Sequence, residues 1–360
     1  MIYNDVRRPR KEIKIGNVCI GGNYPIATQS MTNTVAGDHA AALEQILALQ
    51  KAGCDIVRIT VPTIEAVNTI QYVKNNGVTI PVVADIHFDY KLALMCAERG
   101  VDKIRINPGN IGSDDRVKKV CDACRQNNIP IRIGVNGGSL ERHILAKYGA
   151  PTAEALCESA LYHIRLLEKF DFDNIVISMK SSDVKCMIDA NVMLADKCSY
   201  PIHLGVTEAG AGNAGLIKSS AGIGSLLCQG IGDTIRVSLT DNPVSEIKAA
   251  RDLLTALDIE GQRGLNVVSC PTCGRTSIDL IALYKEFIRQ AEIEGLDNIA
   301  ATVALMGCAV NGPGEAKNAD FGVAGGKGEA LLFKHGVVCE KIPEDKIIEV
   351  LIKELRNITK

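Results

Sequence analysis

Residues 103–109 read Lys-Ile-Arg-Ile-Asn-Pro-Gly (KIRINPG), a short β-rich run that carries charged residues among isoleucines and ends in a turn. Runs of this kind recur along the first 240 residues: Ile26–Thr32, Ile56–Pro62, Val82–His87, Lys103–Gly109, Ile131–Asn136, Ile175–Lys180, Ile202–Glu208 and Thr234–Leu239. Stretches with helix-period apolar spacing, such as His39–Ala52 and Glu65–Asn76, separate them. Alternating strands and helices predict parallel strands. Eight evenly spaced units favour an α/β TIM barrel over the alternative, a doubly wound open sheet.

Charged residues stand inside these otherwise apolar runs. Five of them are cations: Arg58, Arg105, Arg132, Lys180 and Arg236. The others are the acids Asp85 and Glu208 and the histidine His87. Burying an unpaired charge costs several kcal/mol, so such residues need partners or a ligand of opposite sign. At the C-terminal ends of barrel strands they face the region where TIM active sites form. The cation excess favours a pocket for an anionic substrate over an internal salt-bridge network.

Two further features lie near these strand ends. Asn107 and Asn136 follow Arg105 and Arg132, where they either hydrogen-bond a substrate or cap the next helix. Gly210–Gly215 fits GxGxxG, but it comes after the seventh strand and lacks the acidic residue of a dinucleotide site. A glycine loop there can still present backbone N–H groups to phosphate.

The chain has 13 cysteines, and both this odd number and the expected reducing cytosol argue against a disulfide framework. Cys121 and Cys124 form a CxxC within a predicted helix, Asp114–Asn127, and are expected to be buried there. Most of the others are expected to act as small buried hydrophobes: Cys19, Cys54, Cys96, Cys157, Cys186, Cys198, Cys228 and Cys339.

Two loops rich in Gly and Pro set three cysteines apart. The first is CPTCGR, with Cys270 and Cys273, and the second is MGCAVNGPGEA, with Cys308. Thiolates suit iron–sulfur clusters and zinc equally well, so the fourth ligand decides. Zinc would require Cys339 or His335, which do not share these turns. Glu315 lies seven residues after Cys308, and a carboxylate there would be a weaker, replaceable ligand.

Together these motifs resemble the 4-hydroxy-3-methylbut-2-enyl diphosphate synthase family of the methylerythritol phosphate route to isoprenoids. The resemblance runs along the whole chain, through ATQSMTNT, VVADIHF, KIRINPGNIG, IRIGVNGGSL and both cysteine loops. It implies reductive ring opening of 2-C-methyl-D-erythritol 2,4-cyclodiphosphate, with two electrons delivered through a [4Fe-4S] cluster. Reduced flavodoxin or ferredoxin would supply the electrons.

The resemblance also implies site residues. The cluster ligands are Cys270, Cys273, Cys308 and Glu315. The substrate-binding residues are Arg58, Arg105, Asn107, Arg132, Asn136, Lys180, Arg236 and Ser238. Glu208 matches the family's acid near the departing hydroxyl, so Glu208 and Glu315 are the expected catalytic residues.

The expected organisation is a barrel domain at 1–257, a linker at 258–264 and a smaller α+β cluster domain at 265–360. The last barrel helix, Val244–Leu257, runs antiparallel to the strands, so the chain should leave at the end of the barrel opposite the pocket. A seven-residue linker spans about 25 Å at most. We therefore expect a head-to-tail homodimer, in which the cluster domain of one subunit caps the barrel of the other.

Composition sets the remaining expectations. The formal net charge of −2 gives no general attraction to nucleic acid or to a membrane. The first ten residues lack the apolar segment of a signal peptide, and no apolar stretch is long enough for a membrane helix, so a cytoplasmic enzyme is expected. The basic run Arg7–Lys11 is expected to be a solvated turn. Two alternatives stay open: a ligand-binding barrel with a structural zinc domain, and a cluster-bearing redox sensor.

Overall fold

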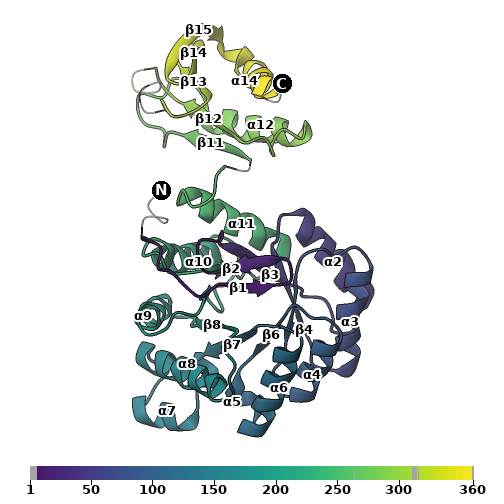
Figure 1. The fold of residues 1–360 in the computed structure, drawn as a ribbon. Coiled ribbons are helices and arrows are strands. Elements are labelled where there is room, and N and C mark those ends of the chain that lie inside the picture. Colours follow the sequence, from purple (N-terminus) through teal and green to yellow (C-terminus); the bar gives the residue numbers. More distant parts are fainter. Residues whose placement is uncertain (1–5, 263, 310–313, 315, 359–360) are drawn as a thin grey trace. The chain divides into compact units, whose positions relative to one another are not determined.

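The structure is a computed structural model that describes residues 6–262, 264–309, 314 and 316–358. The chain divides into two compact units, Met1–Glu260 and Gly261–Lys360, whose relative placement is not determined (Figure 1). The exact bounds of the linker, 258–264, stay a prediction.

The first unit contains a sheet of eight parallel strands. Its order is β8-β7-β6-β5-β4-β3-β10-β9, and a parallel bridge between Ile177 and Ile202 joins β8 to the segment before β9. The prediction of a TIM barrel is confirmed. The strands are β3 (Ala27–Met31), β4 (Ile56–Thr60), β5 (Val82–Asp85), β6 (Lys103–Ile106), β7 (Ile131–Asn136), β8 (Ile175–Lys180), β9 (His203–Leu204) and β10 (Thr234–Ile235).

Helices surround this sheet (Figure 1). They are α2 (His39–Lys51), α3 (Ile64–Asn75), α4 (Tyr90–Glu98), α5 (Pro108–Ile111), α6 (Asp114–Gln126), α7 (Arg142–Tyr148), α8 (Ala153–Glu168), α9 (Val184–Ala195), α10 (Gly212–Leu227) and α11 (Pro243–Ala256), with the 3-10 turn η1 (Gly137–Ser139). Side chains such as Asp38, Thr63 and Asp183 accept hydrogen bonds from the first helical turns, which explains where α2, α3 and α9 begin.

Six strands are shorter than the sequence predicts, and three of them lose three or more residues. The run at 103–109 leaves the sheet at Ile106 because Asn107 caps α5. The runs at 202–208 and 234–239 keep only two residues each as strand. Beyond β9 the backbone passes close to charged groups: a Cβ added at Gly205 would lie 2.7 Å from Lys180 Nζ and 2.9 Å from the Arg236 carbonyl oxygen. The strand ends are therefore shaped by the side chains that fill the barrel.

An antiparallel hairpin, β1 (Ile13–Ile15) and β2 (Val18–Ile20), closes the N-terminal end of the barrel. Its isoleucines form a buried cluster with the first inward-facing residues of the barrel strands: Ile13, Ile15, Ile20, Ala27, Ile56, Val83 and Val176. The sequence did not predict this hairpin, because each strand has only three residues. The expectation of a solvated turn at Arg7–Lys11 is wrong: Arg10 is buried, and Arg7 forms an ion pair with buried Asp233.

The second unit is a five-stranded sheet with order β11-β12-β13-β14-β15. The strands are β11 (Leu265–Ser269), β12 (Ala301–Met306), β13 (Phe321–Gly325), β14 (Glu329–Lys334) and β15 (Val337–Pro343). The first three are parallel, and the last three pair antiparallel. Helices α12 (Leu280–Ile293) and α14 (Ile347–Ile358), the latter after the 3-10 turn η2 (Glu344–Lys346), share one buried core with the sheet. This is the α+β domain that the sequence predicts.

In the described part of the chain, no helix has the length and apolar character needed to cross a membrane.

Candidate active site

Five cations from different strands gather in the barrel interior. Arg58 comes from β4, Arg105 from β6, Arg132 from β7, Lys180 from β8, and Arg236 follows β10 directly. Alternate side chains along each strand point into the barrel, and these five residues belong to the inward-pointing set. Burial lowers the pKa of Lys180 and of Arg132, and neighbouring arginines lower it further, as expected for cations that lie close together. We call these five residues the cation cluster.

Asp85 of β5 is one counter-charge of the cation cluster. Its Oδ1 lies 3.0 Å from Arg105 NH1, and its Oδ2 lies 3.8 Å from Arg58 Nε and 3.8 Å from His87 Nε2. Burial alone would raise the pKa of Asp85, but Arg58 and Arg105 hold it down to about 2. Asp85 is therefore a carboxylate at neutral pH, and it fixes two of the arginines.

Glu246 of α11 is a second counter-charge, and no feature of the sequence points to it directly. Its carboxylate contacts Arg236 and accepts a hydrogen bond from Ser30 Oγ at 2.8 Å and from the Leu239 N–H at 3.1 Å. Glu246 reads in sequence as an ordinary first-turn acid of a helix, yet it is 3% exposed. The signal that would identify Glu246 is its place in the first turn of a helix whose N-terminal end reaches the barrel interior.

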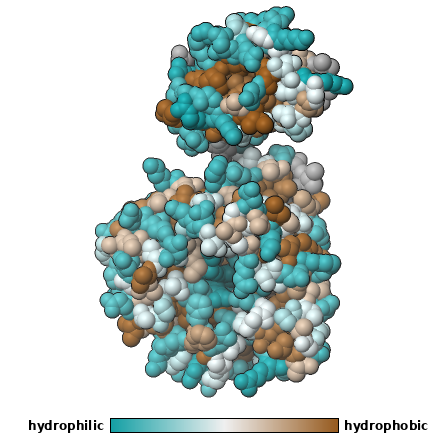
Figure 2. All heavy atoms as spheres, turned by 180° about the vertical axis from the view of Figure 1, so that it is seen from behind, coloured by the Kyte–Doolittle hydropathy of each residue, from teal (hydrophilic) through white to brown (hydrophobic). Residues whose placement is uncertain are grey.

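These two carboxylates do not balance the cation cluster within the described residues. Burial lowers the pKa of Lys180 and of Arg132 well below their usual values, and neighbouring arginines lower both further. Arg132 Nε and NH2 have no hydrogen-bond partner among the residues described, although Arg132 is 1% exposed. Arg58, which is 3.8 Å from Asp85, also contacts the Met31 sulfur at 2.7 Å from NH2. Such an excess of buried positive charge favours a ligand of negative charge. Figure 2 shows a hydrophilic hollow near the middle of this unit.

The predicted polar neighbours lie in the same region. Asn107 caps α5 through Gly109 and donates a hydrogen bond to Ser139 Oγ at 3.0 Å. With its amide turned to satisfy both ends, Asn136 accepts a hydrogen bond from Arg105 NH2 at 3.2 Å. Asn107 is thus a helix cap, and Asn136 supports the cation cluster. Ser238 is half-buried in the segment after β10.

The β7–α7 loop has a support that sequence reasoning missed. The Glu141 carboxylate lies 2.5 Å from His163 Nε2, and His163 of α8 is 1% exposed. Burial alone would raise the pKa of Glu141, but the hydrogen bond from His163 lowers it to about 2. The loop that carries Ser139, the partner of Asn107, is therefore anchored to α8.

Glu208 is the predicted acid on the segment after β9. It is exposed, follows β9 by four residues, and has a φ of 53°, in the left-handed region. Non-glycine residues rarely adopt this conformation, and such residues concentrate at functional sites. The geometry leaves the Glu208 carboxylate free to meet a ligand at the C-terminal ends of the strands.

In the second unit, two parallel strands carry the predicted cysteine ligands. Ser269 of β11 pairs in register with Leu305 of β12, so Cys270 and Cys308 follow neighbouring strands at the same edge of the sheet. The Gly307 N–H donates a hydrogen bond to Cys270 Sγ at 3.3 Å. Cys273 is exposed, and its backbone N–H is held by Thr276 Oγ1 at 3.0 Å.

The three thiols follow neighbouring strands, and the described residues alone do not make up a complete metal site. No group of three His, Cys, Asp or Glu side chains is arranged to hold a metal ion in the described ranges. The fourth predicted ligand, Glu315, lies outside the described residues. The donor set still fits a cluster: three thiols on one edge, one half-buried beside a backbone N–H that already bonds its sulfur.

The other cysteines divide by exposure. Cys121 and Cys124 are fully buried on α6, as predicted, and burial raises the pKa of Cys121 to about 12. Cys54, Cys96 and Cys157 are buried as well. Cys19, Cys186 and Cys198 are only half-buried, and the expectation is wrong for Cys228 and Cys339, which are exposed. Cys339 lies in β15, where most side chains face the surface.

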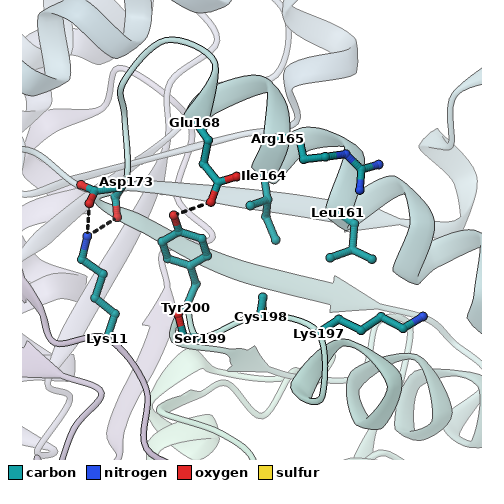
Figure 3. Close-up of a pocket in the computed structure, with 10 residues that line it drawn as sticks. All are labelled: Lys11, Leu161, Ile164, Arg165, Glu168, Asp173, Lys197, Cys198, Ser199 and Tyr200. Carbon is teal, nitrogen blue, oxygen red and sulfur yellow. Dashed lines mark hydrogen bonds and ion pairs between the residues drawn. The ribbon is translucent and has the colours of Figure 1, made fainter.

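A separate cavity of about 530 Å³ lies near the N-terminal ends of β8 and β9 (Figure 3). Tyr200 donates a hydrogen bond to Glu168 at 2.8 Å, and Lys11 pairs with Asp173 at 2.5 Å. Its lining contains none of the predicted site residues. This cavity is at the opposite end of the strands from the cation cluster.

Both units match described protein families. Residues 10–251 match the GcpE TIM-barrel domain, and residues 266–357 match the GcpE protein C-terminal domain. A protein of Fusobacterium nucleatum named 4-hydroxy-3-methylbut-2-en-1-yl diphosphate synthase (flavodoxin) is 53% identical over 97% of each chain. A protein of the same name from Geobacter sulfurreducens is 51% identical over 97% of each chain.

Solved structures give a weaker likeness. Dihydropteroate synthase of Xanthomonas albilineans is 14% identical with a TM-score of 0.48, over 69% of this chain and 97% of that one. The two domain matches and the near full-length relatives decide the assignment: this chain belongs to the GcpE family, with its TIM-barrel and C-terminal domains in one polypeptide.

Proposed function

We propose that this chain converts 2-C-methyl-D-erythritol 2,4-cyclodiphosphate into (E)-4-hydroxy-3-methylbut-2-enyl diphosphate. Two electrons reduce the substrate, its ring opens, and a hydroxyl leaves as water. The observation that carries the proposal is the near full-length similarity to relatives named for this product, in a barrel whose buried cations exceed their carboxylate partners. A cyclic diphosphate supplies two negative charges in a compact ligand.

The proposed substrate contacts are the cation cluster together with Asn107, Asn136 and Ser238. Planar guanidinium groups bind phosphate oxygens through paired hydrogen bonds. Asp85 and Glu246 hold three of the arginines before the ligand arrives, so less side-chain entropy is lost on binding. The free Nε and NH2 of Arg132 are the groups in this set with the strongest need for an acceptor.

The proposed cofactor is a [4Fe-4S] cluster held by Cys270, Cys273, Cys308 and Glu315. When bound, such a cluster supplies electrons one at a time. The Gly307 N–H that bonds Cys270 Sγ would stabilise a thiolate there. The resemblance assigns Glu315 as the exchangeable fourth ligand and as one of the two catalytic residues.

Glu208 is the proposed proton donor to the departing hydroxyl. Its exposed carboxylate lies on the loop after β9. We therefore assign proton donation to this loop and binding of the phosphates to the buried cation cluster. Loss of the hydroxyl as water requires a proton at that oxygen.

A head-to-tail homodimer is the proposed assembly. Arg251 of α11 binds the Gly53 carbonyl at 2.6 Å and Asp55 at 2.8 Å, and its NH1 lies 2.9 Å from Glu260. Gly53 and Asp55 precede β4, so the first unit ends near the N-terminal ends of the strands, away from Glu208. Gly261–Gly264 spans about 14 Å at most. This supports a partner subunit, rather than the same chain, as the source of the cluster domain at each barrel mouth.

The relatives' name includes flavodoxin, and we propose flavodoxin, or a ferredoxin of similar function, as the electron donor. A cytoplasmic location is proposed because a chain with 13 cysteines and an iron–sulfur cluster requires a reducing compartment. The barrel interior gives no basis for a nucleic-acid or membrane partner.

The decisive experiment is anaerobic purification followed by iron and sulfide analysis and a reductive turnover assay with the cyclodiphosphate. We expect brown protein with about four irons per chain and formation of the linear diphosphate when reduced flavodoxin is supplied. Colourless protein with bound zinc would support the structural-zinc alternative. A cluster that is present without turnover of the cyclodiphosphate would support the redox sensor.

A further inference from the structure

A layer of polar side chains lies deeper in the barrel than the cation cluster. It consists of Gln29 of β3, Lys103 of β6, His203 of β9 and Thr234 of β10, each no more than 1% exposed. Lys103 and Thr234 are two residues before Arg105 and Arg236, so they share the inward face of their strands. We call these four residues the floor layer. It lies between the cation cluster and the apolar residues that the β1–β2 hairpin covers.

Lys103 is the unusual member of the floor layer. It is fully buried, and its one hydrogen bond in the described part of the chain joins Nζ to Gln29 Oε1 at 3.4 Å, longer than an ordinary N–H···O bond. No carboxylate pairs with it among the described residues. An ammonium group enclosed in this way would have no counter-ion, which costs several kcal/mol.

The groups that face Lys103 are neutral or positive. Gln29 lies across from it on β3, Arg58 and Arg132 contribute positive charge from β4 and β7, and His203 lies on β9. Burial lowers the pKa of Lys103 well below its ordinary value, and Arg132 and Arg58 lower it further. Asp85, the carboxylate of β5, already pairs with Arg58 and Arg105.

His203 shares this environment. Its Nδ1 lies 2.8 Å from Thr234 Oγ1, while Nε2 has no partner within the described residues. Burial and then the charges of Arg132 and Lys180 lower the pKa of His203. The floor layer thus holds two titratable groups, Lys103 and His203. The arginines around them keep their protons, because a guanidinium group is not deprotonated in proteins.

We propose that Lys103 is an uncharged amine in the ligand-free barrel and takes up one proton from solvent when a dianionic diphosphate binds in the cation cluster. The inference rests on the proposed function for the identity of the ligand. Two negative charges placed among the arginines supply the counter-charge that the floor layer lacks, and in a low-dielectric interior this favours the ammonium form. Lys103 is a positioning residue: its charge strengthens phosphate binding without a change at the reacting bond.

Proton uptake links affinity to pH. Each phosphorus of the cyclic ligand carries one strongly acidic hydroxyl, so the ligand itself does not titrate near neutrality. Between the pKa of Lys103 in the free protein and its pKa in the complex, affinity should fall about tenfold for each rise of one pH unit. Below that window Lys103 is charged in both states, and the pH dependence disappears.

Isothermal titration calorimetry on the anaerobic full-length protein tests this directly. The cyclodiphosphate is titrated at one pH in Hepes and in Tris, whose heats of ionisation differ, so the difference in heat counts the protons taken up. We expect the wild type to take up about one proton more than Lys103→Met. We also expect Lys103→Met to bind roughly tenfold more weakly near neutral pH and to melt no lower than the wild type, because a buried amine has been replaced by an apolar chain of similar size.

Two variants assign the proton. Lys103→Gln, a second non-titrating side chain, should lose the same proton as Lys103→Met. His203→Gln should keep it. Equal proton uptake in the wild type and in both Lys103 variants would overturn the proposal, as would loss of uptake in His203→Gln with none lost at Lys103.

A parallel titration with sulfate, a dianion that does not titrate in this range, separates this inference from the proposed function. If sulfate binds with proton uptake at Lys103 and the cyclodiphosphate does not bind, the inference stands and the proposed substrate is wrong. If neither anion binds, both proposals fail.

Discussion

Arg236 and Glu246 form a two-point contact inside the barrel, with Nε to Oε2 and NH2 to Oε1 both at 3.2 Å. Glu246 belongs to α11, and Arg236 follows β10, so one ion pair joins the last helix of the barrel to the cation cluster. Both side chains are largely shielded from water, with exposures of 15% for Arg236 and 3% for Glu246.

Removing the charge of Glu246 should destabilise the protein without weakening the binding of an anion. Glu246→Gln leaves the Arg236 charge buried without its partner, which costs roughly 3 kcal/mol of unfolding free energy. A bound diphosphate then becomes the counter-charge and restores most of that loss. Chemical denaturation with and without the cyclodiphosphate checks this, with Ser30→Ala as the control that removes one hydrogen bond, worth about 1 kcal/mol. Wild-type stability in Glu246→Gln would contradict the role given to the pair.

Asp85 should make stability depend on acid. Because its folded pKa of about 2 lies below its ordinary value of 3.8, its contribution is fully present above about pH 4 and is lost as pH falls toward 2. The contribution is about 2 kcal/mol. Denaturation measured from pH 6 to pH 2.5 should therefore show a decline in the wild type that is smaller in Asp85→Asn by about two-thirds of that contribution. An identical decline in both proteins would show that Asp85 is not the group responsible.

The three loop cysteines should behave unlike the cysteines of α6. Cys270→Ser, Cys273→Ser and Cys308→Ser should each lose most of the iron and visible absorbance of the anaerobic protein, because each removes a thiolate ligand. Cys124→Ala is the matched control: its thiol is fully buried, so the variant should lose some stability and keep its iron. Iron and sulfide analysis decides the case, and a full cluster in Cys308→Ser would refute the ligand assignment.

Glu208→Gln should slow turnover while leaving cluster content and substrate affinity near wild type. Gln keeps the Cβ and the left-handed backbone at residue 208, so the substitution removes only the acid. General acid catalysis is worth about a hundredfold or more. Single-turnover rates of the reduced protein measure the effect, and Glu98→Gln, an exposed acid at the end of α4, serves as the control. Full activity in Glu208→Gln would remove Glu208 from the mechanism.

The sequence predicted the site best where a charged residue stands in an apolar run that must be buried. Arg105 and Arg132 lie in strand-like runs that must be buried, so their charges indicated a pocket before any geometry was available. Cys121 and Cys124 were correctly placed on a buried helix face because no second ligand pair lies near them. The barrel was predicted from the regular alternation of strand-like and helix-like segments, which is visible in the sequence itself.

The residues that were missed acquire their roles only through tertiary contacts. Glu246 looks like any first-turn acid until α11 packs over Ser30 and Arg236. Lys103 looks like a strand-end lysine, yet the barrel closes around it completely. Arg10 looks solvated, but it is buried. The pattern of charges along a chain does not predict which tertiary contacts a charged side chain will make once the barrel has closed.

The β1–β2 hairpin has a consequence for the order of events in catalysis. With Ile13, Ile15 and Ile20 sealing one end, the barrel is a cup rather than a tube. A substrate that enters this barrel and the product that leaves it must therefore use the same opening, at the C-terminal ends of the strands. In the proposed head-to-tail dimer, where a partner's cluster domain covers that opening, turnover would include an uncovering step, and a faster chemical step alone would not raise the rate beyond it.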